Sequence, residues 1–236
     1  MLYRLPQKLA AEFIGTFGVV FIAAGAICAD QYLRAAGQPS AGLLGAALAY
    51  GLAVAAMVSA FGHVSGAHLN PAITIGHWVT KRLGTFESIG YALAQLLGAT
   101  AGAYTLSAIL PESTWRPVSL GAPDLSSDFT RLHGMALEAA LTFVVVVVAF
   151  ATVTDARGAF RHAAGLPLGL AVAVGYLVGA PFTGAAMNPA RAFGPDLALT
   201  PHHWQNHGVY WVGPLFGGVL AGVIYDRVFL RDQSSP

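Results

Sequence analysis

The fold is decided by two short stretches that share one triplet: Ser65-Gly66-Ala67-His68-Leu69-Asn70-Pro71-Ala72 and Thr183-Gly184-Ala185-Ala186-Met187-Asn188-Pro189-Ala190-Arg191. An asparagine side chain can accept a hydrogen bond from the free N–H groups that begin a helix, and proline fits the first helical position. Each triplet opens an apolar run, over 71–79 and over 189–199. At 1.5 Å per residue, runs of about 9 to 11 residues cover only half of a bilayer. The sequence therefore predicts two half-helices that begin inside a membrane.

Around these triplets lie six longer apolar segments, near 9–30, 41–62, 87–110, 132–153, 163–182 and 208–228. Each is long enough for a hydrocarbon core of roughly 30 Å, which takes about 20 residues. With 56% hydrophobic and 10% charged residues and a mean hydropathy of +0.62, the chain is too apolar for a soluble fold. Isolated strands would leave backbone groups unpaired in lipid. We therefore expect an all-α membrane protein with six transmembrane helices and two re-entrant half-helices.

The two halves of the chain, about 1–115 and 125–236, echo each other beyond the triplets. Glu12 is followed four residues later by Thr16-Phe17, and Glu138 by Thr142-Phe143. Three crossings in each half mean that the second copy enters the membrane upside down, as in proteins built from inverted repeats. The charge of Glu12 also argues against a cleaved signal peptide, so segment 9–30 is interpreted as a spanning helix. The sequence predicts one channel domain over 1–236.

Positive residues predict how the chain is oriented. One side of the layout carries Arg4, Lys8, Lys81, Arg82, Arg157, Arg161, Arg227 and Arg231, while the other carries Arg34, Arg116 and Arg131. Short loops rich in lysine and arginine stay in the cytoplasm. We therefore expect a multi-pass protein of the cell membrane, plasma or inner, with both termini in the cytoplasm.

The composition also excludes several classes of function. A formal net charge of +1 gives no sign of a nucleic-acid partner. The single cysteine, Cys28, excludes an internal disulfide framework and a cysteine metal site. The sequence contains no phosphate-binding glycine loop and no nucleophile with a base, so enzymatic activity is not expected.

The physical consequence of two opposed half-helices is a positive midplane. Their N-termini bring partial positive charge to the centre of the membrane. If each cap oxygen faces its own helix, the amide NH₂ groups of Asn70 and Asn188 remain free to donate into a pore. A water molecule there offers its oxygen to both amides, so its hydrogens point outward and a proton wire is broken. The sequence predicts a pore for neutral, hydrogen-bonding solutes.

These two stretches resemble the signature loops of the aquaporin (major intrinsic protein) family. The resemblance covers nearly the whole chain, from Glu12 to the sixth helix, and the arginine three residues after Asn188 makes it specific. It implies an hourglass fold, assembled as a homotetramer with one pore per subunit. In that pattern the pore triplets are Asn70, Pro71, Ala72 and Asn188, Pro189, Ala190.

The resemblance also implies roles for the residues around each triplet. The backbone carbonyls that line the pore are those of Gly66, Ala67, His68, Leu69, Gly184, Ala185, Ala186 and Met187. Glu12 and Glu138 match buried glutamates that brace the two loops, which suits carboxylates because an unwound loop in a membrane has free N–H groups. The selectivity filter matches Tyr50, Tyr176, Ala185 and Arg191.

Tyr176 departs from the family pattern. Water-selective members carry histidine there, and glycerol facilitators carry a small residue. A tyrosine should narrow the pore and still offer a hydroxyl, which favours water. Ala192 and the pair Tyr210-Trp211 also differ from the glycerol facilitators, whereas Asp196 is unusual for the water group.

The sequence thus favours a passive water channel that is driven by osmotic gradients and excludes protons and ions. The alternative in the same class is a facilitator of small neutral solutes such as glycerol, ammonia or hydrogen peroxide. A proton-coupled transporter that uses Glu12 or Glu138 remains a rival, as does a structural membrane protein in which Tyr50 and Tyr176 close the path. Water and the lipid bilayer are the expected partners.

Histidines give weaker signals. His202, His203 and His207 cluster after the second half-helix, but no carboxylate or thiolate stands at ligand spacing, so solvated loop histidines are expected rather than a metal site. His63 and His68 flank the first triplet and are expected to be packed and hydrogen-bonded rather than to gate the pore by pH. No metal and no cofactor are predicted.

Overall fold

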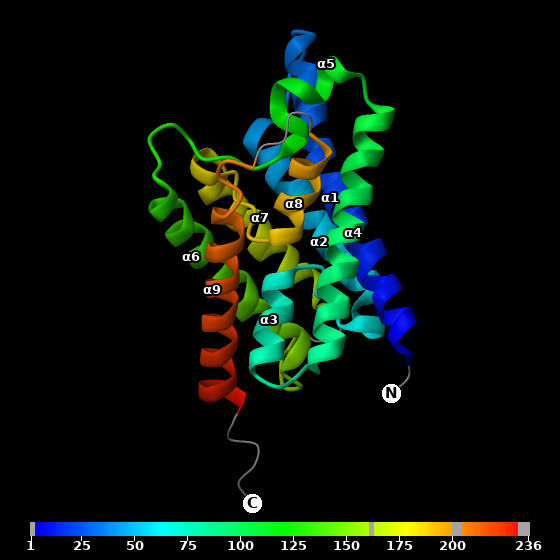
Figure 1. Ribbon diagram of the computed structural model, residues 1–236, viewed down its shortest axis with the longest axis vertical. Helices are drawn as coiled ribbons and strands as arrows, with labels where there is room; N and C mark the ends of the chain where they lie inside the picture. The colour runs from blue at the N-terminus through cyan, green and yellow to red at the C-terminus, as the bar shows by residue number, and fades with distance from the viewer. Residues whose placement is uncertain (1–2, 161–162, 200–203, 231–236) are drawn as a thin grey trace, which may run out of the picture.

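The computed structural model describes residues 3–160, 163–199 and 204–230 (Figure 1). Within these residues six helices are long and apolar enough to cross a membrane. They are α1 (Leu5–Ala35), α2 (Gly42–Ser65), α4 (Thr85–Ile109), α6 (Arg131–Ala149), α7 (Gly165–Thr183) and α9 (Val209–Tyr225). The predicted all-α class with six spanning helices is confirmed.

Two short helices complete the membrane part. They are α3 (Pro71–Val79) and α8 (Pro189–Ala198), and in Figure 1 they lie one above the other in the middle of the bundle. A further short helix, α5 (Glu112–Trp115), and a 3-10 turn, η1 (Arg116–Gly121), cover the end of the bundle opposite the start of α1. The predicted half-helices therefore begin at their triplets.

The ends of the long helices differ from the expectation. The first helix extends from Leu5 to Ala35 instead of 9–30, because helical backbone continues past the apolar segment into its polar flanks. The predicted segment 132–153 is a helix that changes at residue 150 into π-helix, η2 (Phe150–Thr154). The last helix ends in the same way, in η4 (Asp226–Leu230).

The helices approach one another closely at glycines. In the structure α1 packs on α4, α6 on α9 and α2 on α7, while α3 lies against α9 and α8 against α4. A methyl group at Gly98 would stand 2.2 Å from the carbonyl oxygen of Phe13, and one at Gly165 would stand 2.3 Å from that of Ala55. At Gly218 the distance to the oxygen of Ala72 would be 2.3 Å. The absence of a side chain at these glycines thus lets the helix backbones approach closely.

Side chains are distributed as in a protein surrounded by lipid. Large apolar side chains such as Leu97 and Phe216 are more than 60% exposed on the outer faces of their helices. Glu12, Glu138 and Gln95 are fully buried between the helices. Polar side chains within the bundle are therefore shielded from lipid by the helices around them.

Candidate functional site: a pore between the half-helices

Both half-helices begin as their triplets predict. The Oδ1 atom of Asn70 accepts from the backbone N–H of Ala72 at 2.8 Å, and Oδ1 of Asn188 accepts from that of Ala190 at 2.9 Å. Each asparagine has extended backbone and is followed by proline at the first helical position. The predicted capping of both helices is confirmed, and it fixes each asparagine at the buried end of its helix.

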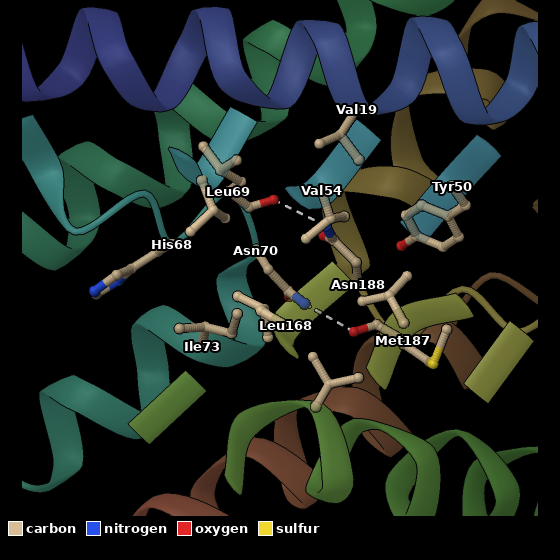
Figure 2. Close-up of a pocket in the computed structure, with 13 residues that line it drawn as sticks. Val19, Tyr50, Val54, His68, Leu69, Asn70, Ile73, Leu168, Met187 and Asn188 are labelled. Carbon is tan, nitrogen blue, oxygen red and sulfur yellow. Dashed lines mark hydrogen bonds between the residues drawn. The ribbon is translucent and has the colours of Figure 1, made fainter. Parts of the chain in front are cut away.

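The amide groups of the two asparagines are crossed between the halves. Nδ2 of Asn70 donates to the carbonyl of Met187, and Nδ2 of Asn188 donates to the carbonyl of Leu69, both at 2.9 Å (Figure 2). The expectation that each NH₂ group remains wholly free was wrong, because the two loops lie close enough to bond. A carboxamide has two donor hydrogens. Each asparagine therefore keeps one hydrogen for another acceptor.

The segments before the triplets, residues 65–70 (the first loop) and 183–188 (the second loop), have an unusual backbone. Positive φ occurs in the same order in both: Gly66, Ala67 and Leu69 in the first loop, and Gly184, Ala185 and Met187 in the second. Glycine adopts this region freely, but for alanine, leucine and methionine it is strained and persists only where the surroundings impose it. Strain repeated in two loops indicates that the path of the backbone itself matters.

The carboxylates of Glu12 and Glu138 bond to these loops. Oε1 and Oε2 of Glu12 accept from the N–H groups of His68 and Leu69 at 2.9 and 2.7 Å. Glu138 accepts in the same way from Ala186 and Met187, also at 2.9 and 2.7 Å. Since buried N–H groups without partners are costly, each carboxylate stabilises a loop that has no helical bonds of its own.

Several polar residues at the loops escaped the sequence analysis. Ser65 and Thr183 donate to Glu12 and Glu138 at 2.6 and 2.8 Å. The sequence did contain a signal for these two residues, because both stand five residues before a triplet asparagine. Tyr91 and Tyr210 also form a matched pair, because they donate to the carbonyls of Ser65 and Thr183 from 26 and 27 residues further along the chain. Gln95 donates to Glu12, and its position on another helix gives no local signal.

A narrow cavity lies between the two triplet asparagines (Figure 2). It encloses about 20 Å³ of space that a water molecule can reach, and Asn70 and Asn188 lie in its wall. The rest of the wall is mostly apolar and comes from Val19, Tyr50, Val54, Val58, Leu69, Ile73, Val145, Leu168, Val172 and Met187, together with His68. A volume of this size holds on the order of one water molecule. The narrow cavity is therefore apolar apart from a few polar groups.

Wider hollows lie at the two ends of α2 and α7. One, with about 450 Å³ of water-accessible space, is lined by Asp30, Arg34 and Tyr176 among others. The other, with about 760 Å³, is lined by residues such as Ser59, His63 and Ala164. Val58 borders both this second hollow and the narrow cavity. Two wide mouths thus flank a constriction, which is the form of an hourglass.

Two of the four predicted filter residues line the hollows described above. Tyr50 lines the cavity and Tyr176 the mouth, and their rings meet edge to face with centroids 5.9 Å apart. The hydroxyl of Tyr50 donates to the carbonyl of Ala186 at 2.9 Å, so this ring is held in place. Ala185 is fully buried.

Arg191 has little contact with other polar groups. It is 1% exposed, and its guanidinium carbon lies 5.8 Å from the centre of the Tyr50 ring. In the described part of the chain, Nε and Nη1 are buried without a hydrogen-bond partner. Buried donors without partners are rare. The guanidinium therefore carries two buried nitrogens for which no described residue is an acceptor.

The histidines only partly follow expectation. His68 is buried and its Nδ1 lies 3.1 Å from Oγ1 of Thr74, as expected for a packed residue, and its ring stacks on that of His77. His63, by contrast, is exposed, and its ring makes an edge contact with that of Tyr3. The expectation that His63 is packed was wrong, because the helix turns it toward the wide mouth.

The expectation of a solvated loop was also wrong for His207, which is 9% exposed and bonded to Asp196 at 2.5 Å. The carboxylate stands eleven residues earlier, on the second half-helix, so no short ligand spacing in the sequence reveals it. His202 and His203 lie outside the described residues. Within those residues no group of three or more histidine, cysteine, aspartate or glutamate side chains could hold a metal ion.

Comparison with known proteins adds independent information. A model of the family described as Major intrinsic protein matches residues 3–225. The chain is 44% identical to aquaporin TIP4-4 of Zea mays, over 95% of this chain and 87% of that protein. It is 41% identical to the lens fiber major intrinsic protein of Gallus gallus, over 93% and 80% of the two chains.

A solved structure of similar fold is the aquaglyceroporin from Plasmodium falciparum. Its TM-score is 0.84 at 24% identity, and the match covers 96% of this chain and 98% of that one. At this identity the likeness concerns the fold alone.

Proposed function

Because the chain belongs to the major intrinsic protein family, and is a multi-pass membrane channel rather than an enzyme, we propose that it is a passive water channel. Water moves down osmotic gradients, and protons and ions are excluded. The observation that carries the proposal is the constriction of about 20 Å³ with both triplet asparagines in its wall. A triol such as glycerol needs several times the room of one water molecule.

The path of water follows from the positions of donors and acceptors. A water molecule leaving the wide mouth beside Tyr176 passes the rings of Tyr50 and Tyr176 and the guanidinium of Arg191. Ala185 leaves space beside them. The walls beyond this point are mostly apolar and give the water molecule few hydrogen-bond partners. The cost of removing its hydration shell is offset mainly by the asparagine amides and by the backbone carbonyls of the two loops. These carbonyls belong to Gly66, Ala67, His68, Leu69, Gly184, Ala185, Ala186 and Met187. Sparse, ordered partners favour passage in single file.

Proton exclusion rests on charge and orientation. Each asparagine keeps one amide hydrogen after bonding to the opposite loop, so two donors still face a water molecule at the midplane. The N-termini of α3 and α8 add partial positive charge at the same place. Arg191 adds a full charge near the mouth. A hydronium ion or metal cation is therefore repelled at two successive points along the path.

The wider architecture belongs to the same proposal. One channel domain spans 1–236 as two inverted repeats, and Glu12 and Glu138 brace the two loops. Four copies assemble, each with its own pore, in the plasma or inner membrane with both termini in the cytoplasm. In support, α1 packs on α4 as α6 packs on α9, and both loops have the same order of positive φ values.

Stopped-flow light scattering on proteoliposomes tests the proposal. Vesicles challenged with sucrose should shrink fast with a weak temperature dependence, and vesicles challenged with glycerol should shrink without rapid re-swelling. Tyr176→Gly should widen the passage beside the Tyr50 ring, at the entrance from the first mouth, and raise glycerol permeability. Tyr32→Gly, on an exposed face of α1, is the matched control and should behave as the wild type. Rapid re-swelling of the wild type in glycerol would favour a solute facilitator, and shrinkage no faster than that of empty vesicles would favour a structural protein.

A further inference from the structure

The outer end of α8 is fixed by a buried hydrogen-bonded chain that is separate from the pore wall. Asp196, near the end of α8, is 1% exposed. Its Oδ2 atom lies 2.5 Å from Nδ1 of His207, which stands just before α9. Nε1 of Trp211, in the first turn of α9, donates to Nε2 of the same imidazole at 2.9 Å. One imidazole therefore connects the half-helix to a spanning helix.

The donors and acceptors of these hydrogen bonds determine which ring nitrogen of His207 carries the proton. An indole nitrogen only donates, so Nε2 of His207 must accept and carries no hydrogen. The hydrogen of the neutral imidazole is then on Nδ1, where it donates to the Asp196 carboxylate. A hydrogen bond to an ionised acceptor is shorter and stronger than a neutral one. The link between α8 and the start of α9 is thus charge-assisted and directional.

Arg191 depends on this link because its head group is held by few other contacts. Its Nε and Nη1 atoms have no hydrogen-bond partner among the described residues. The position of the guanidinium must then come chiefly from the backbone of α8, which also carries Asp196 five residues later. The inner end of α8 is fixed by the cap at Asn188, and its middle packs on α4, where a methyl group at Gly194 would stand 2.4 Å from the oxygen of Ala99.

We propose that Asp196 and His207 are positioning residues that hold the outer end of α8. Through α8 they hold Arg191 in the geometry that excludes protons and also excludes solutes larger than water. The inference rests on the proposed function, in which Arg191 is a filter residue. It assigns a role to the aspartate that made the sequence unusual among water channels. Asp196 and His207 touch no permeant; they act through the half-helix.

The test is the selectivity of reconstituted channels. Glycerol permeability and proton leak are each divided by the water permeability of the same vesicles, so that the number of folded channels cancels. Asp196→Ala should raise these ratios by about tenfold, since small displacements of a positioned group have effects of this order or more. Asp196→Asn keeps an oxygen that accepts from Nδ1, and should stay close to wild type. Tyr104→Phe removes an exposed 3.3 Å bond to the carbonyl of Leu197 near the same end of α8, and should change nothing.

Arg191→Val separates the failure of this inference from that of the proposed function. If Arg191→Val raises the ratios and Asp196→Ala does not, the positioning role is overturned and the filter assignment stands. If neither variant raises them, the filter assignment itself fails, and this inference with it. Equal ratios in Asp196→Ala and Asp196→Asn would also overturn the positioning role, because the acceptor that only the asparagine retains would then make no difference to selectivity. A loss of folded protein would lower all fluxes together and leave the ratios unchanged.

A spectroscopic measurement does not depend on any variant folding. In wild-type protein labelled with ¹⁵N and reconstituted at neutral pH, the imidazole of His207 should give the signals of the neutral tautomer with its hydrogen on Nδ1. Signals of the other tautomer or of the imidazolium ion would overturn the inference.

Discussion

The two buried glutamates have different surroundings although both bond to a loop. Glu12 accepts from Ser65, from two backbone N–H groups and from Gln95, which donates at 2.8 Å. Glu138 accepts from Thr183 and from two N–H groups. All these neighbours are donors. Both oxygens of each carboxyl group therefore serve as acceptors for its loop, which is a structural role and not proton coupling.

Replacing Glu12 with glutamine tests this reading. The amide NH₂ of Glu12→Gln would face donors, so at least one N–H of the first loop loses its acceptor, at a cost of about 1–3 kcal/mol in the free energy of unfolding. We expect a lower melting temperature in detergent and a loss of water conduction. Glu87→Gln, which removes a partly exposed ion pair with Lys8, is the control and should cost less than about 1 kcal/mol. A Glu12→Gln protein of normal stability that loses only pH-driven uptake would instead indicate proton coupling.

At this scale the sequence predicted the residues that stand in repeated patterns, which are the triplets and the two glutamates, and also Arg191, three residues after Asn188. The structure places both triplet asparagines in the wall of the narrow cavity, each glutamate on its loop, and Arg191 beside the ring of Tyr50. Gln95 and the pair Asp196–His207 were out of reach. Their partners lie on other helices, so no local spacing reveals them. His63 was misjudged because one turn of helix decides whether a side chain faces the bundle or the mouth.

Among the elements, the spanning helices are held together by backbone contact. At Gly98 a methyl group would stand 2.2 Å from a carbonyl of α1, a distance that real side chains do not adopt. Without a hydrophobic driving force between helices in lipid, close packing at such points supplies much of the association energy.

Gly98→Ala should therefore push α1 and α4 apart. Overpacking of this kind costs about 1–3 kcal/mol, which should appear as a lower melting temperature and as aggregation during purification. The matched control is Gly62→Ala in α2, where the nearest atom would be 4.0 Å away. Because alanine is a better helix former than glycine, Gly62→Ala should be neutral or slightly stabilising. Similar melting temperatures for the two variants would contradict the packing argument.

The beginnings of the half-helices were predictable to the residue, since a cap is a local signal. The ends of α6 and α9 were not. Both change into π-helix, at Phe150–Thr154 and Asp226–Leu230, close to contacts between distant segments. Arg82 pairs with Asp226, and Tyr225 reaches Asp155. These contacts depend on the assembled bundle, which a pattern of apolar residues does not describe.

The two ends of the molecule differ in the positively charged residues that they carry. Arg4 and Lys8 stand at the start of α1, while Arg82 pairs with Asp226 and Arg157 donates to the carbonyl of Phe229, both just after α9. The start of α1 and the end of α9 lie at the lower end of Figure 1. The α1–α2 connection, with Gln38, lies at the other end. The number of crossings and the grouping of charges were readable from the sequence. Which residues meet between the halves was not, because contacts such as that of Asn188 with Leu69 span 119 positions.

Orientation can be measured with single cysteines. Cys28 is fully buried and should give no background. In intact cells a membrane-impermeant thiol reagent should label Gln38→Cys, whereas Lys81→Cys should react only after the cells are made permeable, because both positions are exposed but at opposite ends. The reverse pattern would place the termini outside.

The hydrogen bonds of the two asparagines also determine when, during synthesis of the chain, the two loops can join. The carbonyl of Leu69 receives its donor from Asn188. A ribosome that adds about 5–20 residues per second needs roughly 6–24 s to travel from one to the other. Throughout that interval the first re-entrant loop lacks its partner, and a nascent chain holds only half of a constriction. The passage between the two loops is therefore completed only when Asn188 has been added and has reached Leu69.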